Sequence, residues 1–276
     1  PGRAMIAVDW RNRAFHRHGA LIRNAGWMLF AQVGRLVIHA GLFFLLARAL
    51  GAHGFGMVAG SLALVLVLAP FSAWGSGNIL IMRVSRNPEA FPVYYGNALL
   101  ITVLSSSILT CLALVAAALF IPALPLELVL TLAVAELLFG RIVEISGQGF
   151  QALERLRAMA GLNLVLSACR FAAALSVTVT WQQVRPEQWG QWYLVSTAVA
   201  AGIGVAWVVT RIGRPRLAPR LAVRELRNGL YFSVSLASSS IYNDIDKTLL
   251  VRLATADAAG LYAAAYRIVG IAFLPI

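Results

Sequence analysis

Three long runs of this sequence contain no charged residue and no histidine, and they limit the possible fold more than any other feature. They span residues 54–82, 90–126 and 188–210. A hydrocarbon core about 30 Å thick requires roughly 20 such residues in a helix. A helix of a soluble bundle needs a polar face that repeats along its length, which these runs lack. The runs therefore predict an all-α, polytopic transmembrane bundle.

The composition and the placement of charge support this class. Apolar residues make up 60% of the chain and charged residues 12%, against about 45–50% apolar residues in soluble domains. The net charge of +12 could suggest a nucleic-acid partner. However, all but one of the 23 basic residues are arginines, and most lie between the apolar runs. This distribution indicates topogenic charge, and no nucleic-acid partner is expected.

Eight membrane spans are predicted. They cover residues 24–47, 56–82, 94–120, 127–147, 158–181, 189–210, 229–251 and 258–276. The connectors on one side, including the N-terminal segment, contain 15 arginines, and those on the other side contain only Arg48, Arg185 and Arg252. The positive-inside rule therefore places the N-terminus in the cytoplasm.

An internal repeat predicts two parallel lobes. A shift of 204 positions aligns Arg23-Asn24 with Arg227-Asn228, and Gly56 with Gly260. The predicted first and seventh spans are six helices apart and share an orientation, as in transporters built from parallel six-helix repeats. We expect a cytoplasmic basic segment (1–23), a six-helix lobe (24–210), an arginine-rich inter-lobe linker (211–228) and the first two helices of a second lobe (229–276). Because the second lobe stops there, and the chain opens on Pro1, the sequence is expected to be a fragment.

Nine charged residues lie at membrane depth, where each costs about 3 kcal/mol at the centre of an inserting helix. They are Arg35, Glu136, Arg141, Glu144, Arg170, Asp244, Asp246, Lys247 and Arg267. Such residues face the interior of a bundle and mark functional sites by default. The spacing of three predicts ion pairs between Arg141 and Glu144 and between Asp244 and Lys247.

Arg35 and Arg170 have no acidic neighbour on their own helices. Two roles are open for them: binding an anionic substrate, whose phosphate oxygens match the planar guanidinium, or pairing across helices with Glu136 or Asp246. His39 lies one turn after Arg35 and is expected to be a polar cavity residue. No metal-ligand cluster accompanies it.

Two further segments have a predicted role in transport. Asp244 and Asp246 form a D-x-D pattern, but inside an apolar helix this favours a site for a coupling cation or proton over a glycosyltransferase motif. Pro70, Gly75 and Gly77 predict a broken second span, which can serve a rocking motion or packing alone. No nucleophile elbow, phosphate loop, HExxH or paired-cysteine motif is present, so the protein is not expected to be an enzyme.

Several motifs, in order, resemble bacterial polysaccharide flippases of the multidrug, oligosaccharidyl-lipid and polysaccharide exporter superfamily. The run LARALGAHGFG (46–56) resembles their first outer turn, and WGSGNILIMR (74–83) resembles the end of their second helix. Glu154-Arg155 resembles the inner turn after their fourth helix. NDIDK (243–247) and GLYAAAY (260–266) resemble their seventh and eighth helices. The resemblance covers nearly the whole chain from Ile22 onward.

The resemblance implies a fold of twelve to fourteen helices and flipping of undecaprenyl-pyrophosphate-linked oligosaccharide across the bacterial inner membrane by alternating access. It implies a cationic lumen, for which Arg35, Arg141, Arg170 and Lys247 occupy suitable spans. His39, Glu136, Glu144, Asp244 and Asp246 are candidates for coupling or gating. No cofactor is expected beyond a coupling Na⁺ or H⁺. The expected partners are the lipid-linked oligosaccharide, membrane lipids, and the polysaccharide polymerase and chain-length machinery.

Two alternatives stay open. A cation-coupled multidrug exporter of the same superfamily would have acidic coupling sites in place of an arginine-lined lumen. A membrane-embedded polysaccharide polymerase or glycosyltransferase would have a large outer loop with catalytic side chains, and the predicted outer connectors are short.

Overall fold

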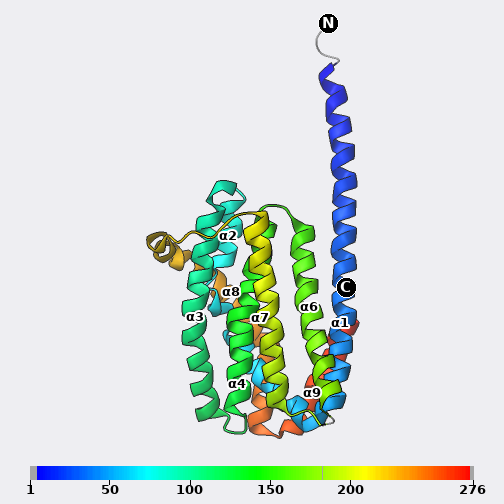
Figure 1. The fold of residues 1–276 in the computed structure, drawn as a ribbon, viewed down its shortest axis with the longest axis vertical. Coiled ribbons are helices and arrows are strands. Elements are labelled where there is room, and N and C mark those ends of the chain that lie inside the picture. Colours follow the sequence, from blue (N-terminus) through cyan, green and yellow to red (C-terminus); the bar gives the residue numbers. More distant parts are fainter. Residues whose placement is uncertain (1–4, 182, 274–276) are drawn as a thin grey trace.

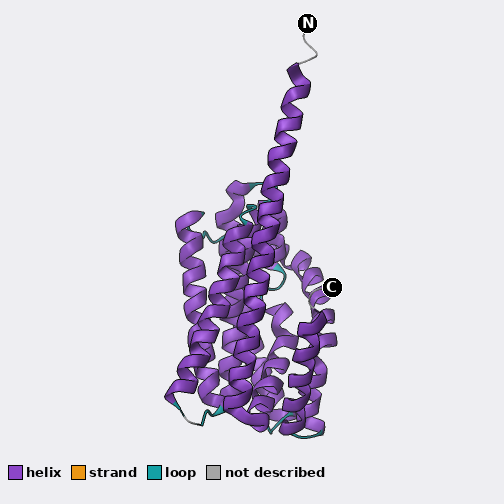
Figure 2. Ribbon diagram, turned by 90° about the vertical axis from the view of Figure 1, so that its right-hand side faces the viewer, coloured by secondary structure: helices purple, strands orange, loops and turns teal. Residues whose placement is uncertain are grey.

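The computed structural model describes the backbone of residues 5–181 and 183–273. Side chains are described for residues 33–181, 183–238, 249–250, 253–255 and 257–266. The described part is helical and contains no strand (Figure 2). The prediction of an all-α membrane bundle is therefore confirmed.

The helices follow one another with short connectors (Figure 1). They are α1 (Met5–Ser72), α2 (Ser76–Val84), the 3₁₀ turn η1 (Pro88–Ala90), α3 (Phe91–Phe120), α4 (Leu126–Ala133), the π-helical η2 (Val134–Gly140), α5 (Arg141–Ala152), α6 (Leu156–Thr180), α7 (Pro186–Arg211), α8 (Pro219–Leu253) and α9 (Ala256–Phe273). Element α1 is two helices joined at Gly51, whose φ of 66° only glycine adopts easily.

Four stretches of the described chain are long and apolar enough to cross a membrane: Val33–Ser72, Pro88–Phe120, Leu156–Thr180 and Pro186–Arg211. Because α1 bends at Gly51, these four stretches overlap five of the predicted spans, at 24–47, 56–82, 94–120, 158–181 and 189–210. The spans predicted at 127–147 and 229–251, and the described part of the span predicted at 258–276, up to residue 273, lie on helical segments. Their crossing of the membrane stays a prediction.

The predicted break in the second span is present. The helix ends at Ser72 and restarts at Ser76, with left-handed backbone at Trp74 (φ 45°) and Gly75 (φ 64°). Pro70 lies inside the last turn of α1, three residues before the break. Within the predicted inter-lobe linker (211–228), α8 begins at Pro219.

The connectors separate by charge. Residues 85–90, 153–155 and 212–218 connect helices at one end of the bundle, and α1 extends far beyond that same end (Figure 1). We call this the arginine-rich end. The bend at Gly51 and the connectors 121–125, 181–185 and 254–255 lie at the opposite end. The predicted segregation of arginines therefore matches the geometry, whereas the side of the membrane on which each end lies stays a prediction.

Helices α8 and α9 pack closely on the first helices through glycines. A side chain on Gly229 would collide with the backbone carbonyl of Trp74, and one on Gly75 with the carbonyl of Gly229. At the opposite end, a Cβ on Gly260 would collide with the carbonyl of Ala52 and lie 3.1 Å from the amide nitrogen of Gly56. The two glycines that the repeat aligns, 56 and 260, thus lie against each other.

These close contacts predict that Gly260→Ala and Gly229→Ala each destabilise the protein by about 1–3 kcal/mol, because the obstacle is backbone and not a flexible side chain. The apparent Tm of the purified protein in detergent measures the effect. Gly202→Ala is the matched control, since a Cβ there meets nothing within 4 Å and alanine favours a helix. Equal Tm values for all three variants would contradict the packing described.

Candidate functional site

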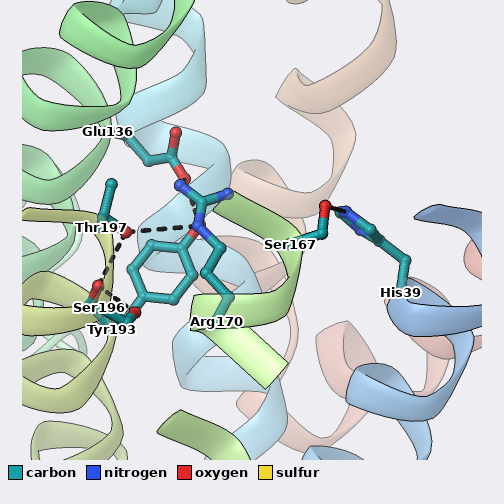
Figure 3. Close-up of polar contacts among 7 residues, drawn as sticks. All are labelled: His39, Glu136, Ser167, Arg170, Tyr193, Ser196 and Thr197. Carbon is teal, nitrogen blue, oxygen red and sulfur yellow. Dashed lines mark hydrogen bonds and ion pairs between the residues drawn. The ribbon is translucent and has the colours of Figure 1, made fainter. Parts of the chain in front are cut away.

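A buried ion pair lies inside the bundle between η2, α6 and α7 (Figure 3). The Nη2 of Arg170 on α6 lies 2.7 Å from Oε1 of Glu136 on η2, and the two side chains are only 12% and 16% exposed. The guanidinium also donates from Nε to the Thr197 hydroxyl, at 3.3 Å. A low-dielectric setting requires such partners, because an unpaired buried charge is very costly.

Tyr193 of α7 completes this cluster. Its hydroxyl donates a hydrogen bond to Glu136 Oε1. Its ring lies under the guanidinium, with Cζ of Arg170 4.4 Å from the ring centroid, a cation–π geometry. We call Glu136, Arg170, Tyr193 and Thr197 the Glu136–Arg170 cluster.

The local sequence explains how the cluster is assembled. Leu132 of α4, Ala135 of η2, and Ala173 and Ala174 of α6 are buried in the same hydrophobic core as Tyr193. Glu136 lies in the π-helical segment Val134–Gly140, and π-helical turns within α-helices are frequent at functional sites. The wider turn interrupts the α-helical register between α4 and α5.

A second polar group lies along α5. Nη1 of Arg141 is 2.5 Å from Oε2 of Glu144, which confirms the predicted i,i+3 pair. Gln148, one turn further, donates to Glu144 Oε1 at 3.4 Å. We call Arg141, Glu144 and Gln148 the polar stripe of α5. Its Glu144 side chain is 46% exposed, whereas both charged side chains of the Glu136–Arg170 cluster are mostly buried. Gly77 of α2 packs directly against the Gln148 side-chain carbonyl.

The predicted residues on α1 lie near α6. His39 Nε2 is 3.2 Å from the Ser167 hydroxyl (Figure 3). Arg35 is half-buried and makes no hydrogen bond or ion pair with any residue whose side chain is described. The role of Arg35 in substrate binding stays a prediction.

Of the two roles that the sequence left open for Arg170, the structure shows pairing across helices. Glu136, offered by the sequence as one of two partners across helices, pairs with it. Asp244, Asp246, Lys247 and Arg267 have side chains outside the described residues, so the proposed Asp244–Lys247 pair and their roles stay predictions.

The sequence analysis missed a junction between α2 and α8 at the arginine-rich end. Nη2 of Arg83 lies 2.7 Å from Oε1 of Glu225, whose side chain is 7% exposed. Asn228 donates to the other Glu225 oxygen at 2.7 Å. The indole of Trp74 donates to the Leu226 carbonyl at 3.2 Å. The sequence shows Glu225 as an acidic residue inside an arginine-rich linker, but this pattern does not indicate which arginine it pairs with.

The described side chains contain no group of three or more His, Cys, Asp or Glu residues placed to hold a metal ion. Cys111 is exposed, Cys169 is partly buried, and neither is in a disulfide.

Helices of membrane-spanning length, with ion pairs in the interior of their bundle, define a polytopic α-helical membrane protein. The family model of the description "Polysaccharide biosynthesis protein" matches residues 21–274. The chain therefore belongs to this family of polysaccharide biosynthesis and flippase proteins, as its motifs indicated. Neither a search of curated proteins nor a search of solved structures gives a match.

Substitutions in the Glu136–Arg170 pair test how much it contributes to the stability of the protein. Arg170→Met leaves the Glu136 carboxylate buried without its cation, so we expect a loss of about 3–5 kcal/mol in stability. Replacing both residues (Glu136→Leu with Arg170→Met) should recover most of the loss, because no charge remains. The apparent Tm and the yield of membrane-inserted protein measure both effects.

Arg141→Met is the matched control for this experiment, since its partner Glu144 is far more exposed and a smaller cost is expected. A double variant as unstable as Arg170→Met would contradict an electrostatic origin for the effect.

Proposed function

We propose that the protein moves an oligosaccharide linked to undecaprenyl pyrophosphate across the bacterial inner membrane, for the synthesis of a surface polysaccharide. The observation that supports this most is a membrane bundle, in a polysaccharide biosynthesis family, with arginines at membrane depth. A membrane-embedded carrier fits this combination better than an enzyme does, because the sequence contains no catalytic motif. The polysaccharide polymerase and the chain-length machinery are its proposed partners.

Arg35 and Arg141 are the proposed contacts for the substrate pyrophosphate. Arg35 lacks a partner among the described side chains, and Arg141, itself 17% exposed, pairs with Glu144, whose side chain is 46% exposed. Guanidinium groups bind phosphate oxygens through two parallel hydrogen bonds. Lys247 stays a candidate on α8. The Glu136–Arg170 cluster is proposed to brace the bundle and to provide a coupling acid, for Na⁺ or H⁺, when Glu136 is released from Arg170.

Alternating access requires helices that separate and meet again. The junction of Arg83, Glu225, Trp74 and the Gly75–Gly229 contact has the form of a cytoplasmic gate: it joins the two proposed lobes at one end by a few specific contacts. With the N-terminus in the cytoplasm, as the arginine distribution predicts, this end faces the compartment where the substrate is made.

A substitution at Arg35 tests the substrate contact. A hydrogen bond to a charged group is worth about 1.5–3 kcal/mol, so Arg35→Ala should weaken function by roughly ten- to a hundredfold. The measurement is the amount of surface polysaccharide in a deletion strain that expresses each variant at an equal level. Arg35→Lys, which keeps the positive charge, should retain part of the export.

Arg48→Ala is the control, because Arg48 is an exposed arginine of the same helix, near its bend. Normal polysaccharide export by Arg35→Ala would contradict the proposed contact between Arg35 and the substrate. Export of a drug-like cation in place of polysaccharide would favour the multidrug exporter.

Charge reversal tests the gate. Arg83→Glu and Glu225→Arg each place like charges in contact, so each should reduce polysaccharide export, and the double exchange should restore part of it. Arg86→Glu is the control, as an exposed arginine three residues from Arg83. A double exchange that exports no better than either single variant would show that the ion pair itself is not required.

A further inference from the structure

The segment from Ile212 into the first turns of α8 lies at the edge of the bundle and is held there by its backbone. The Arg216 amide donates to the Pro92 carbonyl at 2.8 Å, and the Ala218 amide donates to the Asn97 side-chain carbonyl at 2.8 Å. Gly96 lies directly against the Arg216 backbone. The segment extends sideways from the arginine-rich end (Figure 1). The backbone of this segment is therefore attached to α3 by specific contacts.

The first turns of α8 have two different faces. The inner face contains Leu221, Ala222, Glu225, Leu226 and Gly229, which are buried or partly buried. The outer face contains Arg220, Val223, Arg224, Arg227 and Leu230, which are all exposed. The spacings of three, four and seven residues place each set on one side of a helix.

The outer face has positive charge that the described protein does not neutralise. No acidic residue occurs between Glu187 and Glu225, and Glu225 points inward to Arg83 and Asn228. Arg214, Arg216, Arg220, Arg224 and Arg227 make no side-chain ion pair with any described residue. The acids Glu89 and Glu154 belong to other connectors at this end.

Exposed aliphatic side chains alternate with these arginines. Leu217 is 64% exposed and Val223 68%. A soluble anionic ligand would satisfy the arginines but not these side chains. A leaflet of anionic phospholipid satisfies both, since apolar side chains enter the boundary of the acyl chains while guanidinium groups bind phosphates.

From these observations we propose that residues 214–230 form a binding surface for anionic phospholipid, which we call the lipid-binding elbow. Arg216, Arg220 and Arg224 bind the lipid phosphates, and Leu217, Val223 and Leu230 enter the interfacial layer. Because the opposite face of the same helix contains Glu225, the lipid contact and the gate share one rigid element. The proposal is independent of the transported substrate.

The test uses the full chain purified in a zwitterionic detergent, to which phosphatidylglycerol or phosphatidylcholine is added. Phosphatidylglycerol should raise the apparent Tm of the wild type, and phosphatidylcholine should raise it much less. The double variant Arg220→Gln/Arg224→Gln should lose more than half of the rise. Arg86→Gln/Arg157→Gln removes the same amount of charge from exposed positions near the same end. This control variant should show the full rise in Tm.

Further measurements distinguish a defined lipid surface from diffuse charge attraction and from substrate binding. Val223→Asn leaves the charge unchanged and should reduce the rise, whereas no reduction would overturn the apolar part of the proposal. Equal losses in both double variants would show diffuse attraction and overturn a defined surface. A larger rise with farnesyl pyrophosphate than with phosphatidylglycerol, lost in Arg220→Gln/Arg224→Gln, would assign the arginines to a prenyl-pyrophosphate substrate and overturn the lipid assignment.

Discussion

The absence of water from the hydrocarbon layer is the constraint on which the rest of this structure depends. A charged or polar group at membrane depth must find its partner within the protein. The Glu136–Arg170 cluster meets this requirement with an ion pair, two hydroxyl groups and an aromatic ring from three helices. These contacts fix η2, α6 and α7 relative to one another. Because η2 continues directly into α5, they also hold the start of α5, where Arg141 and Glu144 lie.

The same constraint governs the contacts between the two proposed lobes. Their close approaches use glycines and backbone carbonyls, and α2 and α8 add one ion pair at the arginine-rich end. The glycine contacts require a close fit but bury little polar surface, so separating them exposes few unsatisfied groups. This is the property that a moving junction in a membrane needs.

The sequence predicted features that follow from local physics: the helical class, the alternation of charged connectors, the break near Gly75 and the Arg141–Glu144 pair. It left open the partner of Arg170 and missed the partner of Arg83. The reason is distance along the chain, since Glu136 is 34 residues from Arg170, and Glu225 is 142 residues from Arg83. Periodicity identifies the side of a helix on which a residue lies, but not which helix faces it. The hydroxyl of Tyr193, 57 residues from Glu136, contacts that acid for the same reason without any signal in the sequence.

The contact between Gly56 and Gly260 has an evolutionary consequence. If the two repeats arose by gene duplication, these positions descend from one ancestral glycine. In a symmetric dimer of half-length chains, a residue meets its own copy only near the two-fold axis. The ancestral protein would then have required a single glycine there, and one mutation would have damaged both sides of the interface. Fusion of two such halves would divide this requirement between two codons and would allow the two sides of the junction to diverge.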